Sequence, residues 1–183
     1  MGEKKLEEQL VQNCRDGDTT AFSKLINIYR KRLFTYLLRL TRDRMTAEDL
    51  FQETLIRVWK GIKNYSDQQK FSSWLFTIAH HVAIDEIRTK KVRGIFAQLN
   101  EDYEMSSKVT PHSELVAAET KLALEKVVEA LPENQKRVFL LRQHSGMPFK
   151  DIALVMNQPL NTVLSQMHYA VKKLKESLIE RNE

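Results

Sequence analysis

Residue types that commonly carry catalysis occur in this sequence, but their spacing matches no catalytic pattern. It has no phosphate-binding glycine loop, H-E-x-x-H zinc motif, dinucleotide-binding glycine pattern or cysteine-nucleophile pattern. Among the five histidines only His80 and His81 are adjacent. Neighbouring helical residues point about 100° apart, and no acid or cysteine completes a ligand set there. The sequence therefore predicts no enzyme, no metal site and no cofactor.

The most specific chemical pattern lies in residues 149–163, and it is a pattern for binding DNA. Ile152 and Val163 are apolar at positions where two helices would pack together, and Ala153 is small where the second helix crosses. Asn157 stands where the turn between them needs a positive φ, which asparagine tolerates better than other non-glycine residues. These features predict a helix-turn-helix, which offers its second helix to the major groove. A plain helical hairpin without a nucleic-acid role is the alternative.

The composition favours a helical protein with a polyanionic partner. The 183 residues include 29 Lys and Arg against 24 Asp and Glu, which gives a net charge of +5. Five Gly and four Pro are too few for a many-stranded β protein, and 42% hydrophobic residues suffice for a core. Because Cys14 is the single cysteine, no intrachain disulfide is expected, which fits a reducing cytoplasm.

Hydrophobic periodicity predicts four helices before residue 94. The i, i+3, i+4, i+7 spacing of apolar residues is clearest in the second of them. Thr46 and Asp49 form a capping-box-like pair, with Thr46 as the expected N-cap of the third helix. The expected helices cover Leu6–Cys14, about Thr20–Thr41, Thr46–Lys60, and Phe71 to the basic residues Arg88, Lys90, Lys91 and Arg93.

A change of composition near residue 94 predicts two small helical domains joined by a flexible linker. Residues 94–118 are acidic, rich in Ser and Thr and without periodicity, so we assign domains to 1–93 and 119–183. In the second domain, helices are expected at about 122–131, 133–144, 149–156 and 161–178. Lys4 and Lys5 precede no apolar stretch, and no run approaches about 18 apolar residues. Neither a signal peptide nor membrane insertion is expected.

Four stretches, in this order, resemble the bacterial extracytoplasmic-function (ECF) sigma factors, a family of small promoter-recognition subunits of RNA polymerase. The resemblance covers nearly the whole chain except the linker. The stretches are Ala21–Leu40, Ala47–Trp59, Phe71–Arg88, and the C-terminal segment from Leu131-Pro132 through the helix-turn-helix to Leu174.

The resemblance implies an alternative sigma factor. Its first domain would bind the polymerase clamp and open the minus-ten promoter element, and its second would read the minus-thirty-five element and touch the polymerase flap. The implied partners are core RNA polymerase, promoter DNA and an anti-sigma factor, in the cytoplasm and without a small-molecule substrate. Two alternatives stay open: a dimeric free-standing helix-turn-helix regulator, and a protein-interaction module with a degenerate recognition helix.

Residues of the third helix are expected to bind polymerase. Its apolar residues cannot all face one narrow core stripe, so part of this set should remain exposed, and an exposed apolar patch rimmed by acids is a docking surface. The alternative is a solvated acidic first turn that only stabilises its helix. The predicted polymerase-binding residues are Asp49, Leu50, Gln52 and Glu53.

The predicted DNA contacts fall into two groups. In the first domain they are the loop before the fourth helix, two histidines taken as exposed, and the basic helix end, while Phe71 and Trp74 are assigned to the core. In the second domain the family usually has Lys or Arg at three positions that are here Leu164, Gln166 and Tyr169, so minus-thirty-five binding should be weakened or changed. Gln166 can still read adenine. The predicted contacts are Lys63, Asn64, Tyr65, His80, His81, Arg88, Lys90, Lys91, Thr162, Ser165, Gln166, Tyr169, Lys172 and Lys173.

Overall fold

A computed structural model describes residues 2–66, 70–94 and 124–179, and every regular element among them is helical. The predicted all-α fold is therefore confirmed for this part of the chain. The structure divides into two compact units, each described by itself below. The predicted linker, apart from its first residue, lies outside the described residues.

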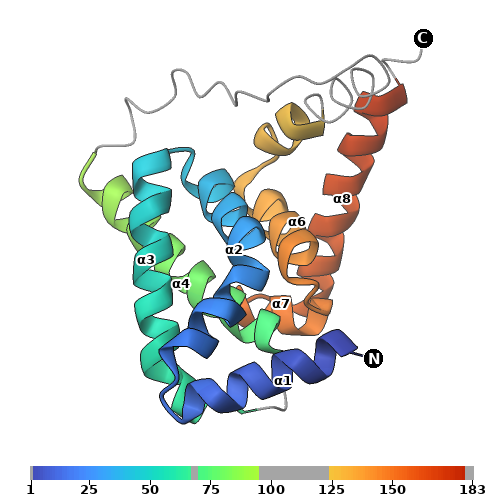
Figure 1. The fold of residues 1–183 in the computed structure, drawn as a ribbon. Coiled ribbons are helices and arrows are strands. Elements are labelled where there is room, and N and C mark those ends of the chain that lie inside the picture. Colours follow the sequence, from blue (N-terminus) through green and yellow to red (C-terminus); the bar gives the residue numbers. More distant parts are fainter. Residues whose placement is uncertain (1, 67–69, 95–123, 180–183) are drawn as a thin grey trace, which may run out of the picture. The chain divides into compact units, whose positions relative to one another are not determined.

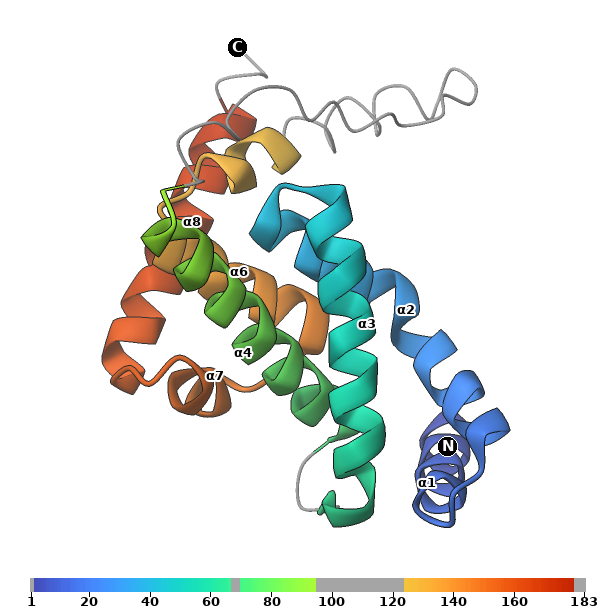
Figure 2. The same cartoon turned by 90° about the vertical axis from the view of Figure 1, so that its left-hand side faces the viewer.

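The first unit contains the four predicted helices. They are α1 (Gly2–Arg15), α2 (Thr19–Thr41), α3 (Arg44–Gly61) and α4 (Phe71–Val92), with a short 3-10 turn, η1 (Ile62–Asn64), after α3. Helix α2 packs against α1, α3 and α4, and α3 also packs against α4 (Figures 1 and 2). The core is formed by fully buried side chains from α2 and α4, among them Leu25, Leu33, Leu37, Leu75 and Phe76.

Local signals separate α1 from α2. The Asp18 carboxylate caps α2 by accepting hydrogen bonds from the backbone N–H groups of Thr20 (2.7 Å) and Ala21 (3.0 Å). Before it, Gly17 has a φ of 92°, a conformation that glycine adopts without steric cost. These two residues confirm the predicted stop between the first two helices.

The predicted N-cap of the third helix is wrong by three residues. Asp43, not Thr46, is the N-cap of α3, with φ −138° and ψ 124°, and its carboxylate accepts the Thr46 backbone N–H at 2.9 Å. Thr46 lies inside the first turn and is buried. An Asp three residues before a Thr is itself a good capping pattern, and here the carboxylate takes the capping role.

Cys14 is buried in the first unit, and we expect it to be inert in the folded protein. Burial, with a smaller contribution from the Asp18 carboxylate, raises the pKa of the thiol to about 11. Since the thiolate is the reactive form, a disulfide reagent at pH 8 should label Cys14 slowly in the native chain and rapidly in urea. Equal rates in both conditions would contradict this assignment.

The second unit contains a helical segment at residues 124–129, then most of α6 (Glu133–Ser145), α7 (Phe149–Val155) and α8 (Leu160–Ile179). Helix α7 packs against α8, near the start of that helix in Figure 1. Across the described residues, no helix has the length and apolar character needed to cross a membrane.

Candidate polymerase and nucleic-acid interfaces

Helix α3 has a buried side and a polar outer side. Leu50, Thr54 and Val58 are buried, and the Thr54 hydroxyl donates to the Leu50 carbonyl at 2.7 Å. Leu50 therefore packs inside the unit, and its prediction as a direct polymerase contact is corrected. Periodicity identified the apolar residues of this helix but not which of them turn inward.

Acids and an amide remain on the outer side of α3. Asp49 and Gln52 are exposed, and Glu53 forms an ion pair with Arg57 at 2.7 Å in which both side chains stay near half-exposed. We call Asp49, Gln52 and Glu53 the docking face. Ile56, 49% exposed, also lies on the surface of α3. This combination of acids with accessible apolar area is suited to contact with another protein.

The segment before α4 presents only part of its predicted DNA contacts. Lys63 and Asn64 are exposed, but Tyr65 is buried. Its ring centroid lies 4.9 Å from that of Trp74 and 5.8 Å from that of Phe71. The Tyr65 ring is therefore part of the aromatic core, and its prediction as a DNA contact is corrected.

The two adjacent histidines of α4 have different environments. His80 is buried, and its Nδ1 lies 2.8 Å from the Tyr36 hydroxyl, within hydrogen-bond distance. His81 is exposed. The prediction that both are exposed is wrong for His80, because successive helical residues point in different directions and only one can face solvent here.

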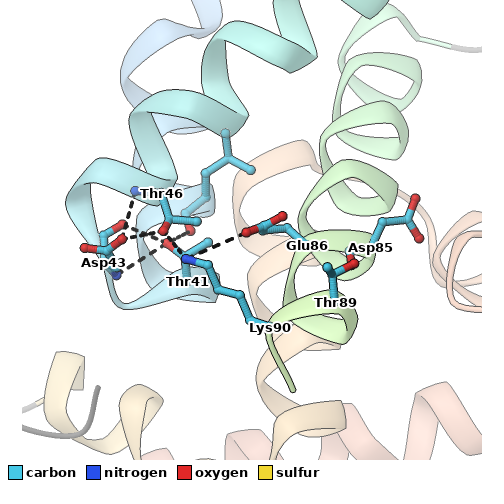
Figure 3. Close-up of polar contacts among 8 residues, drawn as sticks. Thr41, Asp43, Thr46, Asp85, Glu86, Thr89 and Lys90 are labelled. Atoms are coloured by element: carbon cyan, nitrogen blue, oxygen red, sulfur yellow. Dashed lines mark hydrogen bonds and ion pairs between the residues drawn. The ribbon is translucent and has the colours of Figure 1, made fainter. Parts of the chain in front are cut away.

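Figure 3 shows the Lys90 side chain joining the end of α4 to the start of α3. Its ammonium group donates a hydrogen bond to the Thr46 hydroxyl and lies 3.8 Å from the Glu86 carboxylate. The Thr46 hydroxyl in turn donates to the Asp43 carboxylate. We call Asp43, Thr46, Glu86 and Lys90 the Lys90 cluster. Lys90 is thus engaged within the fold, whereas its neighbours Arg88 and Lys91 are exposed. Its contact with DNA stays a prediction.

The Lys90 cluster should contribute measurably to stability. The hydrogen bond from the Thr46 hydroxyl, aided by the charge of Lys90, holds the pKa of the Asp43 carboxyl below 3.8. We expect Asp43→Ala to lower the free energy of unfolding by about 1 kcal/mol at pH 7, the usual value of an N-cap. Urea denaturation measures this difference.

The pH dependence follows from the direction of that shift. Because the pKa is lower in the folded state, the charge of Asp43 stabilises the fold above pH 3.8, and this contribution is lost as pH falls through the lowered value. The difference in free energy of unfolding between the native chain and Asp43→Ala should therefore become smaller below pH 3.8. Asp85→Ala is the matched control, because the hydrogen bond from Thr89 goes to the Asp85 backbone carbonyl. A loss as large in the control would contradict the assignment.

The turn between α7 and α8 has the predicted geometry. Asn157 has a φ of 50°, and the following N–H of Gln158 donates to the Ala153 carbonyl at 2.9 Å, which closes the end of α7. Ile152 and Val163 are fully buried. The predicted roles of these apolar residues and of Asn157 are confirmed.

Helix α8 offers most of the predicted contacts to solvent. The side-chain oxygen of Gln166 is instead shielded and has no hydrogen-bond partner among the described residues. Reading adenine takes both polar ends of the amide, and this contact of Gln166 stays a prediction. The exposed predicted contacts on α8 are Thr162, Ser165, Tyr169, Lys172 and Lys173, and Leu160 and Leu164 are exposed beside them.

No three His, Cys, Asp or Glu side chains gather into a possible metal site within residues 2–66, 70–94 and 124–179. Sequence reasoning missed two participants, the capping carboxylate of Asp43 and the structural role of Lys90. The Asp-x-x-Thr spacing would have indicated the first, whereas the second joins residues 44 positions apart.

Residues 25–93 match the protein family described as Sigma-70 region 2, and residues 121–174 match Sigma-70, region 4. The ECF RNA polymerase sigma factor SigL of Mycobacterium tuberculosis is 32% identical over 149 residues, which cover 81% of this chain and 83% of SigL. The chain belongs to the ECF sigma factor family. The family predicted from the four sequence stretches is thereby confirmed.

Other relatives of this sigma factor span nearly its whole length. SigW of Bacillus subtilis is 26% identical over 176 residues, covering 92% of this chain and 94% of SigW. Two solved structures share the fold with a TM-score of 0.65. One is CnrH in complex with the cytosolic domain of CnrY, at 18% identity over 97% of this chain and 99% of that chain. The other is the sigma factor RpoE in complex with the anti-sigma factor NepR from Bartonella quintana. It is 23% identical over 86% of this chain and 96% of that chain.

The predicted contact residues of this sigma factor fall inside the two matched regions. The docking face and the exposed basic end of α4 lie in the region 2 match, and the exposed residues of α8 up to Lys173 lie in the region 4 match. The predicted contact residues therefore lie in the parts of the chain that match the two family regions.

Proposed function

We propose that this sigma factor binds core RNA polymerase and directs it to promoters through a division of labour between its two units. The observation that carries the proposal is the presence, in one chain, of regions 2 and 4 with exposed polar faces on their predicted contact helices. We assign the first domain to residues 1–93 and the second to 119–183, with 94–118 as linker. The chain acts in this proposal as an initiation factor without catalysis of its own, in the cytoplasm where polymerase and promoters meet.

In the first domain the docking face binds polymerase and a basic surface engages the minus-ten element. The acids supply charge complementarity, which contributes more to specificity and association rate than to affinity. Strand opening needs a positive surface that holds the separated strands. The residues proposed for the minus-ten element are Lys63, Asn64, His81, Arg88 and Lys91, which are all exposed.

In the second domain α8 enters the major groove of the minus-thirty-five element. Its exposed polar residues contact DNA, with Lys172 and Lys173 on phosphates. Lys172 lies 3.8 Å from the Glu176 carboxylate. Because this ion pair is exposed and weak, a DNA phosphate can readily take the place of the carboxylate. We expect this domain to bind DNA weakly alone and to act within the polymerase complex.

An anti-sigma factor is the proposed regulator. The two similar solved structures are complexes, and the partner is described as an anti-sigma factor for the Bartonella protein and as the cytosolic domain of CnrY for CnrH. The likeness of fold supports a partner of the same kind for this chain.

Transcription by core polymerase on a library of promoter fragments tests the proposal. Adding the protein should give transcripts that start at a defined subset of the library, whereas core polymerase alone gives none of them. Transcripts that are identical with and without the protein would contradict the proposal.

A further inference from the structure

The outer side of α8 is unusual in its chemistry. Between Leu160 and Tyr169 the sequence has neither Lys nor Arg, so no long cationic side chain stands in the first ten residues of this helix. Leu160 and Leu164 are 44% and 41% exposed, and as i, i+4 neighbours they lie on the same side of the helix. Exposed leucines at this spacing form a small apolar strip beside the polar contacts.

The position of this strip on a helix-turn-helix limits what it can touch. The N-terminal residues of the second helix are those that reach base edges in the major groove. Leu160 is the first residue of α8 and Leu164 the fifth, whereas Lys172 and Lys173 come two to three turns later. The two leucines therefore stand where bases are read, and the lysines where phosphates are held.

The chemistry of base edges then selects the base. Arg and Lys read guanine through its O6 and N7 atoms, and this part of α8 has neither residue. The only apolar group that a base pair presents in the major groove is the C5 methyl of thymine. A leucine side chain gains from contact with that methyl, because both groups leave water.

We propose that Leu164 is a specificity-determining residue that reads a thymine methyl group in the upstream promoter element. This inference rests on the proposed reading of the minus-thirty-five element by α8. It adds the chemical identity of one base, and it predicts that the element contains thymine opposite the leucine strip rather than guanine.

Uracil substitution tests the inference, because uracil pairs as thymine does and lacks only the methyl group. The full chain with core polymerase first selects its upstream element from a random library. Each thymine of that element is then replaced by uracil, and the affinity of the complete complex is measured. At one or two positions we expect a loss of about fourfold for the native chain, the value of burying one such group.

Two variants make the test specific. The Leu164→Ala variant should bind the thymine duplex more weakly than the native chain does. For this variant the uracil duplex should bind as well as the thymine duplex. Ile179→Ala removes another exposed aliphatic side chain from the far end of α8 and should keep the fourfold difference. A selected element with no uracil effect for the native chain, or a fourfold effect that survives in Leu164→Ala, would overturn the inference and leave the proposed function standing. Selection of no upstream element at all would overturn both.

Discussion

The double variant Asp49→Arg, Glu53→Arg is expected to bind core RNA polymerase roughly 100-fold more weakly than the native chain. Each substitution places a positive charge where the docking face presents a negative one. Juxtaposing like charges across an interface costs several kcal/mol, which corresponds to a change of that size. The affinity of a fluorescently labelled chain for core polymerase, measured at equilibrium, gives the result directly.

The same variant should stay folded. Asp49 is exposed, and Glu53 gives up one exposed ion pair with Arg57, of a kind that contributes at most about 0.5 kcal/mol. Glu8→Arg with Asp16→Arg is the matched control, because it makes the same change of charge at exposed residues outside the region 2 match. Native affinity in the docking-face variant, or an equal loss in the control, would remove these residues from the interface.

Charge reversal at the end of α4, by Arg88→Glu with Lys91→Glu, should weaken promoter binding and not polymerase binding. We expect polymerase affinity to stay unchanged while promoter affinity of the assembled complex falls roughly 30-fold at physiological salt, since two phosphate contacts are lost. The slope of log affinity against log salt should become shallower by about 2. Filter binding or fluorescence anisotropy over a salt series measures both quantities.

Lys24→Glu with Lys31→Glu controls for net charge. Both lysines are exposed on α2, and neither belongs to the proposed DNA surface. An unchanged salt slope in the Arg88 and Lys91 variant would show that these side chains contact no phosphate. A change of equal size in the control would show an effect of overall charge alone.

The parts of the fold that depend on short-range patterns were predictable from the sequence. The apolar spacing of α2 indicated a helix ending at Thr41, and the structure ends it there. The positive φ of Asn157 and the burial of Ile152 and Val163 followed from the requirements of a tight turn between two packed helices. Such features are determined by neighbours in the chain, which are visible in the sequence.

Predictions about which side chains face outward succeeded less well. Leu50, Tyr65 and His80 were expected at the surface and are buried, because other helices or rings cover them. Tyr65, for example, packs on Trp74 of α4, and His80 meets Tyr36 of α2. The periodicity of a single helix gives the relative orientation of its residues. It does not show how much of the helix surface neighbouring helices bury.

The role of Lys90 shows the same limit in a charged residue. In the sequence it stands in a basic run with Arg88 and Lys91, which suggests one common function. In the structure its ammonium reaches Thr46, and this contact depends on the packing of α4 against α3. A run of like charges therefore divides into side chains that stabilise the fold and side chains left available for DNA.

Strand opening in the assembled complex tests the central claim most directly. A base analogue whose fluorescence rises on unstacking is placed in the minus-ten element of a promoter selected by the protein. We predict a fluorescence rise only when the protein and core polymerase are both present, and none with either alone. A rise produced by polymerase without the protein, or no rise with both, would contradict the account.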